Sequence, residues 1–331
     1  MALPARTVGA RASQATDAGT SGRALGLYVE ASFAFSGLRG ASGPDDGRRV
    51  RLDLVSEDEI DAAWPAADAG RTGYTATPYA GAGVLTEHHH EAGYLITAPG
   101  RGRHLIDLDG RRIRTATAAV EPECWQGVLA GQALPLAAVL QGLEVFNASA
   151  VVVAGQVMAF AGPSGAGKSS LAARLMLVGA RFFADDVVAL EVRGQQIVAH
   201  AGLGVVRLGE RGRAAVPHLT AQGADVIGRD GKTLVELSRD VPTLPLRSLY
   251  LLSSVAENEH PDIAPELPDP FRLLAGTHNL SVRTPERLRR QLELVALLGA
   301  RVRIFSARVP HGAERELAHA IFTHAALEVL L

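Results

Sequence analysis

The N-terminal part of the chain alternates apolar and polar positions over short segments that are separated by turn residues. Residues 50–55 alternate as a half-buried strand does, and residues 27–35 are rich in β-forming side chains. A dense turn cluster occupies residues 43–47, and Asp109-Gly110 is a hairpin signal. The pattern predicts short strands over residues 27–135. Further strands are expected at residues 94–97, 104–107 and 112–115.

Helical spacing of apolar positions replaces this alternation at residues 131–142, which predicts a helix that closes a β-rich unit. Two apolar segments, residues 150–154 and 157–161, then predict a pair of strands. The apolar positions that follow recur at helical spacing as far as Gly179, a natural helix stop. The chain therefore changes from a β-rich texture to an alternation of strands and helices.

The remainder of the chain returns mostly to strand and turn patterns before it ends in helices. Strands are predicted at residues 181–184, 187–192, 201–208, 246–252 and 302–306. Residues 257–270, rich in Pro, Glu and Asp, predict a loop, and helices are predicted at 285–298 and 313–331. The organisation predicts three parts: a disordered tail over residues 1–24, a β-rich N-terminal domain over 25–142 and a second domain over 143–331.

Composition and charge exclude several classes of protein. The 331 residues carry a net charge of −2 without a basic stripe, so no nucleic-acid partner is expected. No apolar run reaches the ~18–20 residues of a membrane span, and the start lacks the apolar core of a secretory signal, so we expect a cytoplasmic protein. A lone cysteine, Cys124, excludes an intrachain disulfide and is expected to be a core residue.

The basic residues are divided unevenly, because 31 of the 33 are arginines and only Lys168 and Lys232 are lysines. An Arg-rich genome explains the general replacement of lysine by arginine. Such drift would spare positions that need a compact ammonium group rather than a planar fork. The two lysines are therefore the first candidates for functional positive charges.

Lys168 lies in a complete phosphate-binding motif, G-x-x-x-x-G-K-[ST], between a predicted strand and a predicted helix. Its glycines let backbone N–H groups surround an anion, and the helix N-terminus adds partial positive charge. Lys168 is expected to reach the β- and γ-phosphates of ATP, and the Ser169 hydroxyl is expected to bind Mg²⁺. The expected nucleotide-binding residues are Gly162, Pro163, Ser164, Gly165, Ala166, Gly167, Lys168, Ser169 and Ser170.

Two adjacent carboxylates, Asp185 and Asp186, follow the next predicted strand. If that strand packs beside the strand of the phosphate-binding loop, both side chains approach the γ-phosphate and its metal. Carboxylates there hold Mg²⁺ or accept a proton from an attacking hydroxyl, and their mutual repulsion is expected to raise one pKa. An ABC-transporter ATPase would instead show an LSGGQ-like helix and a more distant Asp, and neither is found.

The loop followed one helix later by Ala-Asp-Asp resembles the C-terminal domain of HPr kinase/phosphorylase and, more distantly, phosphoenolpyruvate carboxykinase. Residues 143–151 are similar to the LHASAV segment of HPr-kinase-related proteins, residues 204–208 to their PxxRL strand, and Asp230-Gly231-Lys232 to their DGK turn. The N-terminal third loosely resembles the small domain of the peptide-kinase branch. The resemblance implies an α/β fold: a P-loop kinase domain with a smaller β-rich N-terminal domain.

The resemblance also implies a function, the transfer of the γ-phosphoryl group of ATP to a serine or other hydroxyl of a peptide, a protein or a small hydroxylated metabolite. On this basis Asp185 is expected to be the base and Asp186, with Ser169, to hold Mg²⁺. Arg207 and Lys232 are candidates for charge stabilisation at the transferred group. The sequence leaves open whether the chain forms a homo-oligomer.

One position departs from the family pattern, because Asn147 stands where the family has a catalytic-site histidine. Asparagine hydrogen-bonds phosphate oxygens but does not shuttle a proton. A second hypothesis is therefore a catalytically impaired ATP-binding pseudokinase that recognises a peptide or acts as a scaffold. His200 and His218 are the histidines considered as spatial substitutes.

Two further clusters have simpler explanations. Residues 87–91 (Glu-His-His-His-Glu) resemble a metal-binding cluster but lack the i, i+4 spacing of a helical zinc site, so a polar loop is expected. Four arginines near the predicted helix at 285–298 are expected to form a solvated face, with an acidic peptide or a phosphate as the alternative ligand. These are Arg283, Arg287, Arg289 and Arg290.

Overall fold

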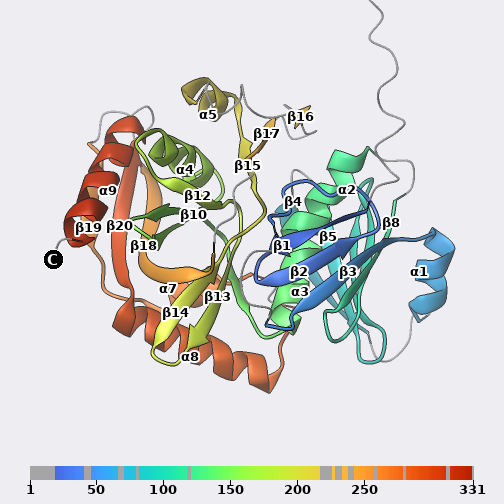
Figure 1. The fold of residues 1–331 in the computed structure, drawn as a ribbon. Coiled ribbons are helices and arrows are strands. Elements are labelled where there is room, and N and C mark those ends of the chain that lie inside the picture. The colour runs from blue at the N-terminus through green and yellow to red at the C-terminus, as the bar shows by residue number, and fades with distance from the viewer. Residues whose placement is uncertain are drawn as a thin grey trace, which may run out of the picture.

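The computed structural model describes residues 19–40, 46–65, 71–79, 82–117, 121–216, 226–227, 233–237, 242–255, 260–278, 281–310 and 314–329. Within these ranges the chain is a mixed α/β protein with an eight-stranded, a nine-stranded and a three-stranded sheet. The layout has two parts, as the sequence predicts, with the eight-stranded sheet in one and the nine-stranded sheet in the other (Figure 1).

The N-terminal sheet is mixed, with parallel pairing where β3 meets β2 and β8 and antiparallel pairing elsewhere. Its order is β1 (Thr20–Ala24), β2 (Leu27–Ala31), β3 (Arg49–Leu54), β8 (Arg112–Ala116), β7 (Gly102–Ile106), β6 (Gly93–Ala98), β5 (Ala82–His89) and β4 (Arg71–Tyr79). The predicted tail over residues 1–24 is therefore wrong at its C-terminal end, because the turn at Leu25-Gly26 pairs β1 with β2. Residues 1–18 lie outside the described residues.

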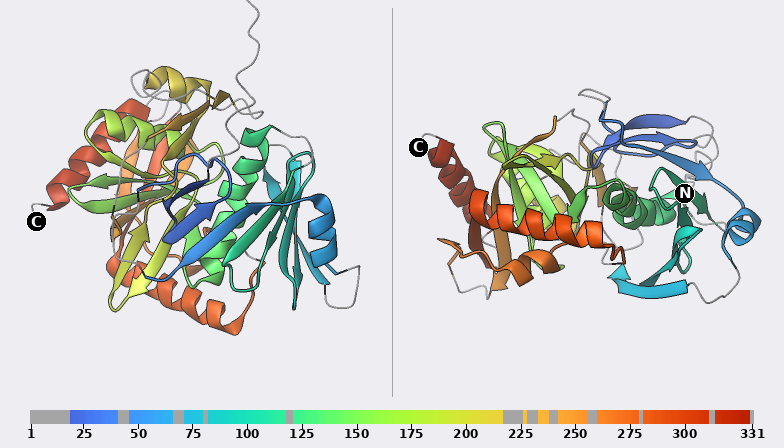
Figure 2. Two further views of the ribbon diagram at one scale, coloured as in Figure 1. Left: turned by 45° about the vertical axis from the view of Figure 1, so that its right-hand side comes forward. Right: turned by 90° about the horizontal axis from the view of Figure 1, so that it is seen from below.

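One continuous helical segment fills the concave face of this sheet. It runs through α2 (Pro122–Val128), a π-helical turn at Leu129–Ala133 and α3 (Leu134–Leu140), and the strands curl around it (Figure 2). The predicted helix at 131–142 is the second half of this segment. Cys124 is buried in α2, as expected. The short α1 (Glu57–Ala63) covers the opposite face, where Ile60 and Trp64 pack against Leu95 and Leu105.

The second sheet carries the predicted phosphate-binding loop, residues 162–169. Its main order is β12 (Arg181–Ala184), β10 (Ala148–Val153), β11 (Gln156–Ala161), β18 (Leu244–Val255), β14 (Gln196–His200), β13 (Val188–Arg193) and β9 (Glu144–Phe146). Strand β20 (Arg303–Pro310) pairs with β18 and with β19 (Asp262–Pro265). Strands β11, β18 and β20 are parallel to one another, so their carboxyl ends share one edge of the sheet.

Helices cover both faces of this sheet. Helices α4 (Lys168–Leu177) and α9 (Glu314–Val329) bury one apolar face, and α7 (Pro270–Ala275) and α8 (Pro285–Arg301) bury the other. The loop predicted at 257–270 is partly wrong, because β19 pairs with β20 and α7 begins at Pro270. None of the described helices is long and apolar enough to cross a membrane.

The three-stranded sheet packs against α4, the helix that follows the predicted phosphate-binding loop. It contains β15 (Val205–Leu208), β17 (Thr233–Glu236) and β16 (Val226–Ile227), and α5 (Glu210–Ala215) follows β15. The predicted strand at 201–208 is thus shorter than expected, because residues 201–204 make contacts with the N-terminal part instead of a ladder.

Arg39 joins the two parts through backbone carbonyls. Its side chain is buried and donates from Nε to the Gly202 oxygen at 2.9 Å and from Nη2 to the Phe183 oxygen at 3.1 Å. Beside it, the Gly204 N–H donates to the Gly37 carbonyl at 2.6 Å. The segment 37–39 therefore fixes both the end of β12 and the start of β15.

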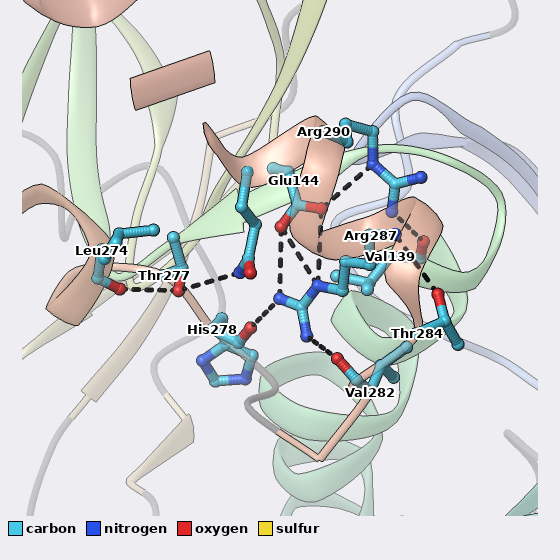
Figure 3. Close-up of polar contacts among 10 residues, drawn as sticks. Val139, Glu144, Leu274, Thr277, His278, Val282, Thr284, Arg287 and Arg290 are labelled. Atoms are coloured by element: carbon cyan, nitrogen blue, oxygen red, sulfur yellow. Dashed lines mark hydrogen bonds and ion pairs between the residues drawn. The ribbon is translucent and has the colours of Figure 1, made fainter. Parts of the chain in front are cut away.

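A buried ion pair joins β9 to α8 (Figure 3). Glu144 and Arg287 are each 1% exposed, and Glu144 also accepts from Arg290 Nε at 3.0 Å. Arg287 donates in addition to the carbonyls of Val282 and His278. The expectation of a solvated arginine face is therefore wrong for Arg287, whose charge is balanced by a carboxylate more than a hundred residues away in the sequence.

We predict that Glu144→Gln lowers the free energy of unfolding by about 3–5 kcal/mol, because it leaves the Arg287 charge buried and uncompensated. Urea unfolding followed by circular dichroism measures the change. The matched control is Asp61→Asn, which removes an exposed partner of Arg103 and should change stability by about 0–1 kcal/mol. Equal effects of the two substitutions would contradict the prediction.

Candidate nucleotide and phosphoryl-transfer site

The predicted phosphate-binding loop connects β11 to α4, and the sequence predicts this order of strand, loop and helix. Gly167, the N-cap of α4, has a φ of 87°, in the region that favours glycine. Gly162 is required for another reason, since a Cβ there would lie 2.7 Å from the Leu252 carbonyl oxygen of the neighbouring strand. The Lys168 ammonium folds back onto the loop, where it donates to the carbonyls of Gly162 at 2.8 Å and Pro163 at 3.0 Å.

Asp185 lies directly after β12, and its carboxylate accepts hydrogen bonds from three different elements. The Ser149 hydroxyl of β10 donates to Oδ1 at 2.6 Å, and the Arg207 backbone N–H of β15 donates to Oδ2 at 2.9 Å. The hydroxyl of Ser169, in the first turn of α4, is a further donor. The structure thus brings together the end of the predicted phosphate-binding motif, the aspartate pair and Arg207.

The route by which Asp185 reaches the loop differs from the expected one. Strand β12 is not adjacent to β11, because β10 lies between them. β10 and β11 form a hairpin that is local in sequence, the other edge of β11 pairs with β18, and β12 pairs with the outer edge of β10. The side chains of Ser149 and Ser169 span the remaining distance to Asp185.

Asp186 occupies a strained position. Its φ is 65°, and the Val187 N–H donates to the Asp185 carbonyl at 2.8 Å, which together define a γ-turn with a positive central φ. The Asp186 side chain is 42% exposed and accepts from Arg207 Nη1 at 3.4 Å. Both residues are partly buried, but the turn gives their carboxylates different partners: Asp185 bonds Ser149 and the Arg207 backbone, and Asp186 bonds the Arg207 side chain.

Asn147 lies at the same edge of the sheet, between β9 and β10. Its Oδ1 is 3.0 Å from Nδ1 of His278, a histidine that the sequence analysis missed. No sequence pattern pointed to His278, because residues 145–147 and 276–278 are far apart in the sequence. The structure joins these segments through a single antiparallel bridge between Phe146 and Thr277. His200 does not occupy this place, since its ring contacts Glu191 and Thr243.

Some predicted residues lie elsewhere or outside the described residues. Asp230, Gly231, Lys232 and His218 belong to the latter group. Ser164 is exposed in the loop, and Ser170 in α4 packs beside Gly212 of α5.

The histidine cluster at residues 87–91 is engaged locally. His89 Nδ1 accepts from the backbone N–H groups of Glu91 and Ala92 at 3.2 and 3.3 Å. Within the described ranges no group of three or more His, Cys, Asp or Glu side chains is placed to hold a metal ion. The predicted polar loop is therefore wrong for Glu87, His88 and His89, which lie in β5 and pair with β4 and β6. Only His90 and Glu91 lie in the turn that follows this strand.

The comparisons with known proteins add little to this picture. The HPr(Ser) kinase/phosphatase from Coxiella burnetii is similar in structure, with 15% sequence identity, a TM-score of 0.32, and coverage of 56% of this chain and 99% of that chain. No protein-family model matches the chain, and no curated protein matches it. At this TM-score the likeness carries no argument, so the function is inferred from the residues of the chain itself.

Burial of the Asp185 carboxylate, and secondly the charge of Asp186, raise the pKa of Asp185 above its ordinary value. Between the ordinary and the raised pKa the folded state binds more protons than the unfolded state, so ionisation of Asp185 lowers stability as the pH rises. Asp185→Asn removes this loss, and its amide can still accept from Arg207 and pair with Ser149.

We therefore predict that Asp185→Asn gains stability relative to the wild type as the pH is raised from about 4 toward neutrality. Urea unfolding of both proteins across that range measures the difference. Asp61→Asn, at an exposed carboxylate, serves as the control for removing one negative charge. A stability difference that is constant with pH would show that the Asp185 pKa is not raised.

Proposed function

We propose that this chain is an ATP- and Mg²⁺-dependent phosphotransferase that transfers the γ-phosphoryl group of ATP to a hydroxyl. The acceptor class is a serine of a peptide or protein, or a small hydroxylated metabolite. The observation that carries the proposal is the position of the Asp185 carboxylate, which interacts with Ser169 of the predicted phosphate-binding motif and accepts from the Ser149 hydroxyl and the Arg207 N–H at 2.6 and 2.9 Å. These contacts join the predicted nucleotide-binding motif to a carboxylate pair and an arginine.

The residues present fit a nucleotide triphosphate with its metal ion. The first N–H groups of α4 have no partners within the helix and suit phosphate oxygens, and Lys168 supplies a compact positive charge. The Ser169 hydroxyl and the Asp185 carboxylate are the hard oxygen ligands that Mg²⁺ takes, with phosphate and water completing its shell. When bound, Mg²⁺ neutralises charge on the phosphates.

The roles of the two aspartates are assigned by their surroundings. Asp185, which interacts with Ser169 and bonds Ser149, suits the metal side of the site. Asp186, accessible and beside Arg207, suits the acceptor side. This assignment reverses the expectation from the sequence, which placed the base at Asp185 and the metal at Asp186.

In the proposed reaction the acceptor oxygen forms a bond to the γ-phosphorus, and the bond between that phosphorus and the β–γ bridging oxygen breaks. The hydroxyl proton passes to the Asp186 carboxylate, and ADP leaves. The Arg207 guanidinium, 3.4 Å from Asp186, stabilises negative charge on the transferred group. Positioning and electrostatics supply the rate, as in other phosphoryl transfers.

A second candidate is an ATP-binding protein that does not transfer phosphate. The neutral Asn147 favours it, because an amide provides neither positive charge nor a proton acceptor at this edge. The aspartate pair and Arg207 favour transfer.

We predict that Lys168→Ala weakens Mg-ATP binding by about 10- to 100-fold, the loss expected for charge-assisted hydrogen bonds to phosphate. Isothermal titration calorimetry measures the affinity. Arg111→Ala, which removes an exposed positive charge on a hairpin of the N-terminal sheet, is the matched control and should bind as the wild type does. Unchanged affinity in Lys168→Ala would remove the nucleotide site.

We predict that Asp186→Asn lowers phosphoryl transfer by about 10²–10⁴-fold, the usual contribution of a positioned base, while Mg-ATP affinity stays near the wild-type value. Transfer is measured with γ-labelled ATP and a library of serine-containing peptides, and release of free phosphate is measured in parallel. Asp185→Asn should instead weaken the Mg²⁺ dependence of ATP binding. A wild-type protein that binds Mg-ATP but releases no phosphate and labels no peptide would support the non-transferring alternative.

A further inference from the structure

His278 and Asn147 form a contact that the proposed reaction does not yet use. The Asn147 N–H donates to the Gly276 carbonyl at 3.0 Å, and the His278 N–H donates to the Val145 carbonyl at 2.6 Å. These two bonds pair the segments 145–147 and 276–278 in antiparallel fashion. The pairing places the imidazole Nδ1 3.0 Å from the Asn147 amide oxygen.

Asn147 lies between the two halves of the proposed site. Its neighbour Ala148 pairs with Ala161, the last residue before the phosphate-binding loop. The Ala148 N–H donates on its other side to the Asp186 carbonyl at 3.1 Å. Asn147 is also exposed, although the residues on both sides of it are buried. Its amide group is therefore accessible at the edge shared by the loop and the aspartate pair.

The backbone of His278 is held by the buried ion pair described above (Figure 3). Arg287 Nη2 donates to the His278 carbonyl at 2.7 Å, and the same guanidinium is bonded to Glu144. Because Glu144 accepts from this guanidinium at Nε and Nη2, the donor to the His278 carbonyl is itself held by a buried carboxylate. The histidine ring thus approaches Asn147 from a segment that is anchored on both sides.

The charge state of the ring determines what it can do. Burial lowers the pKa of His278 to about 4, so near neutral pH the imidazole is uncharged and carries a single N–H. With that hydrogen on Nδ1, the ring donates to Asn147 Oδ1. The amide plane then directs both N–H bonds of Nδ2 away from the histidine.

We propose that His278 is a positioning residue that fixes the Asn147 amide, so that Asn147 presents N–H donors to an oxygen of the phosphoryl group in transfer. This inference rests on the proposed function for the identity of the ligand. It gives Asn147 a neutral, oriented hydrogen-bond role at the reacting group in place of acid–base chemistry.

Side-chain geometry provides a matched set of variants. The amide nitrogen of asparagine can take the place of imidazole Nδ1, and that of glutamine can take the place of Nε2. His278→Asn should therefore keep the donor to Asn147, whereas His278→Gln and His278→Ala should lose it. We expect His278→Ala and His278→Gln to lower kcat by about 10-fold or more with little change in KM for ATP, and His278→Asn to restore most of the loss.

A spectroscopic measurement reports on the amide itself. The chain has three asparagines, Asn147, Asn258 and Asn279, so selective ¹⁵N labelling of asparagine gives three side-chain amide signals. Asn147→Asp identifies the Asn147 signal by its absence. We expect Mg-ATP to shift that signal in the wild type and in His278→Asn, and to shift it much less in His278→Ala and His278→Gln.

The outcomes separate this inference from the proposed function. If calorimetry shows Mg-ATP binding but the Asn147 signal does not move, the inference is wrong and the nucleotide site stands. Equal kcat values in His278→Asn and His278→Ala would also overturn it, because they would indicate a packing role. If Mg-ATP does not bind to the wild type, the proposed function fails first.

Thermal unfolding of each variant identifies any that do not fold. The Asn147→Ala variant, which we expect to lose about 100-fold in kcat, then tests the donor directly.

Discussion

A carboxylate that is taken out of water at the end of a strand must find hydrogen-bond donors inside the protein, and much of this structure follows from satisfying Asp185. Its donors come from Ser149 on β10, Ser169 on α4 and the Arg207 backbone on β15. Each donor belongs to a different layer or sheet. The position of the phosphate-binding helix, the central hairpin and the small third sheet are therefore coupled to one side chain.

The same physical rule explains the two buried arginines. Arg39 satisfies the carbonyls of Phe183 and Gly202, and Arg287 pairs with Glu144 and holds the carbonyl of His278. Arg39 bonds the carbonyl of Phe183, two residues before Asp185. Arg287 bonds the carbonyl of His278, the residue whose ring contacts Asn147. Buried charge in this chain is thus used to fix the backbone around the site, where small displacements would alter the geometry of phosphoryl transfer most.

Local features were predictable from the sequence, and non-local ones were not. The loop at residues 162–169 was identified because its glycines, lysine and serine are contiguous and its flanking strand and helix have clear periodicity. The insertion of β10 between β11 and β12 could not be predicted, because strand order depends on pairing that a single sequence does not encode locally. The contacts of His278 with Asn147 and of Arg287 with Glu144 join residues more than 130 positions apart. The solvated arginine face was predicted from charge alone, which does not reveal a distant carboxylate.

The docking of Gly37 and Arg39 onto Gly202, Gly204 and Phe183 determines what is lost when the two parts of the chain are separated. The apolar core around the first sheet continues into the second part through Val187, Ala189 and Val282. Separating the two parts near residue 142 would expose this apolar surface and break the hydrogen bonds that the Gly37 and Gly202 carbonyls accept across the joint. The joint between the two parts thus combines apolar packing with buried hydrogen bonds to backbone carbonyls, and a substitution at either Gly37 or Arg39 changes both parts at once.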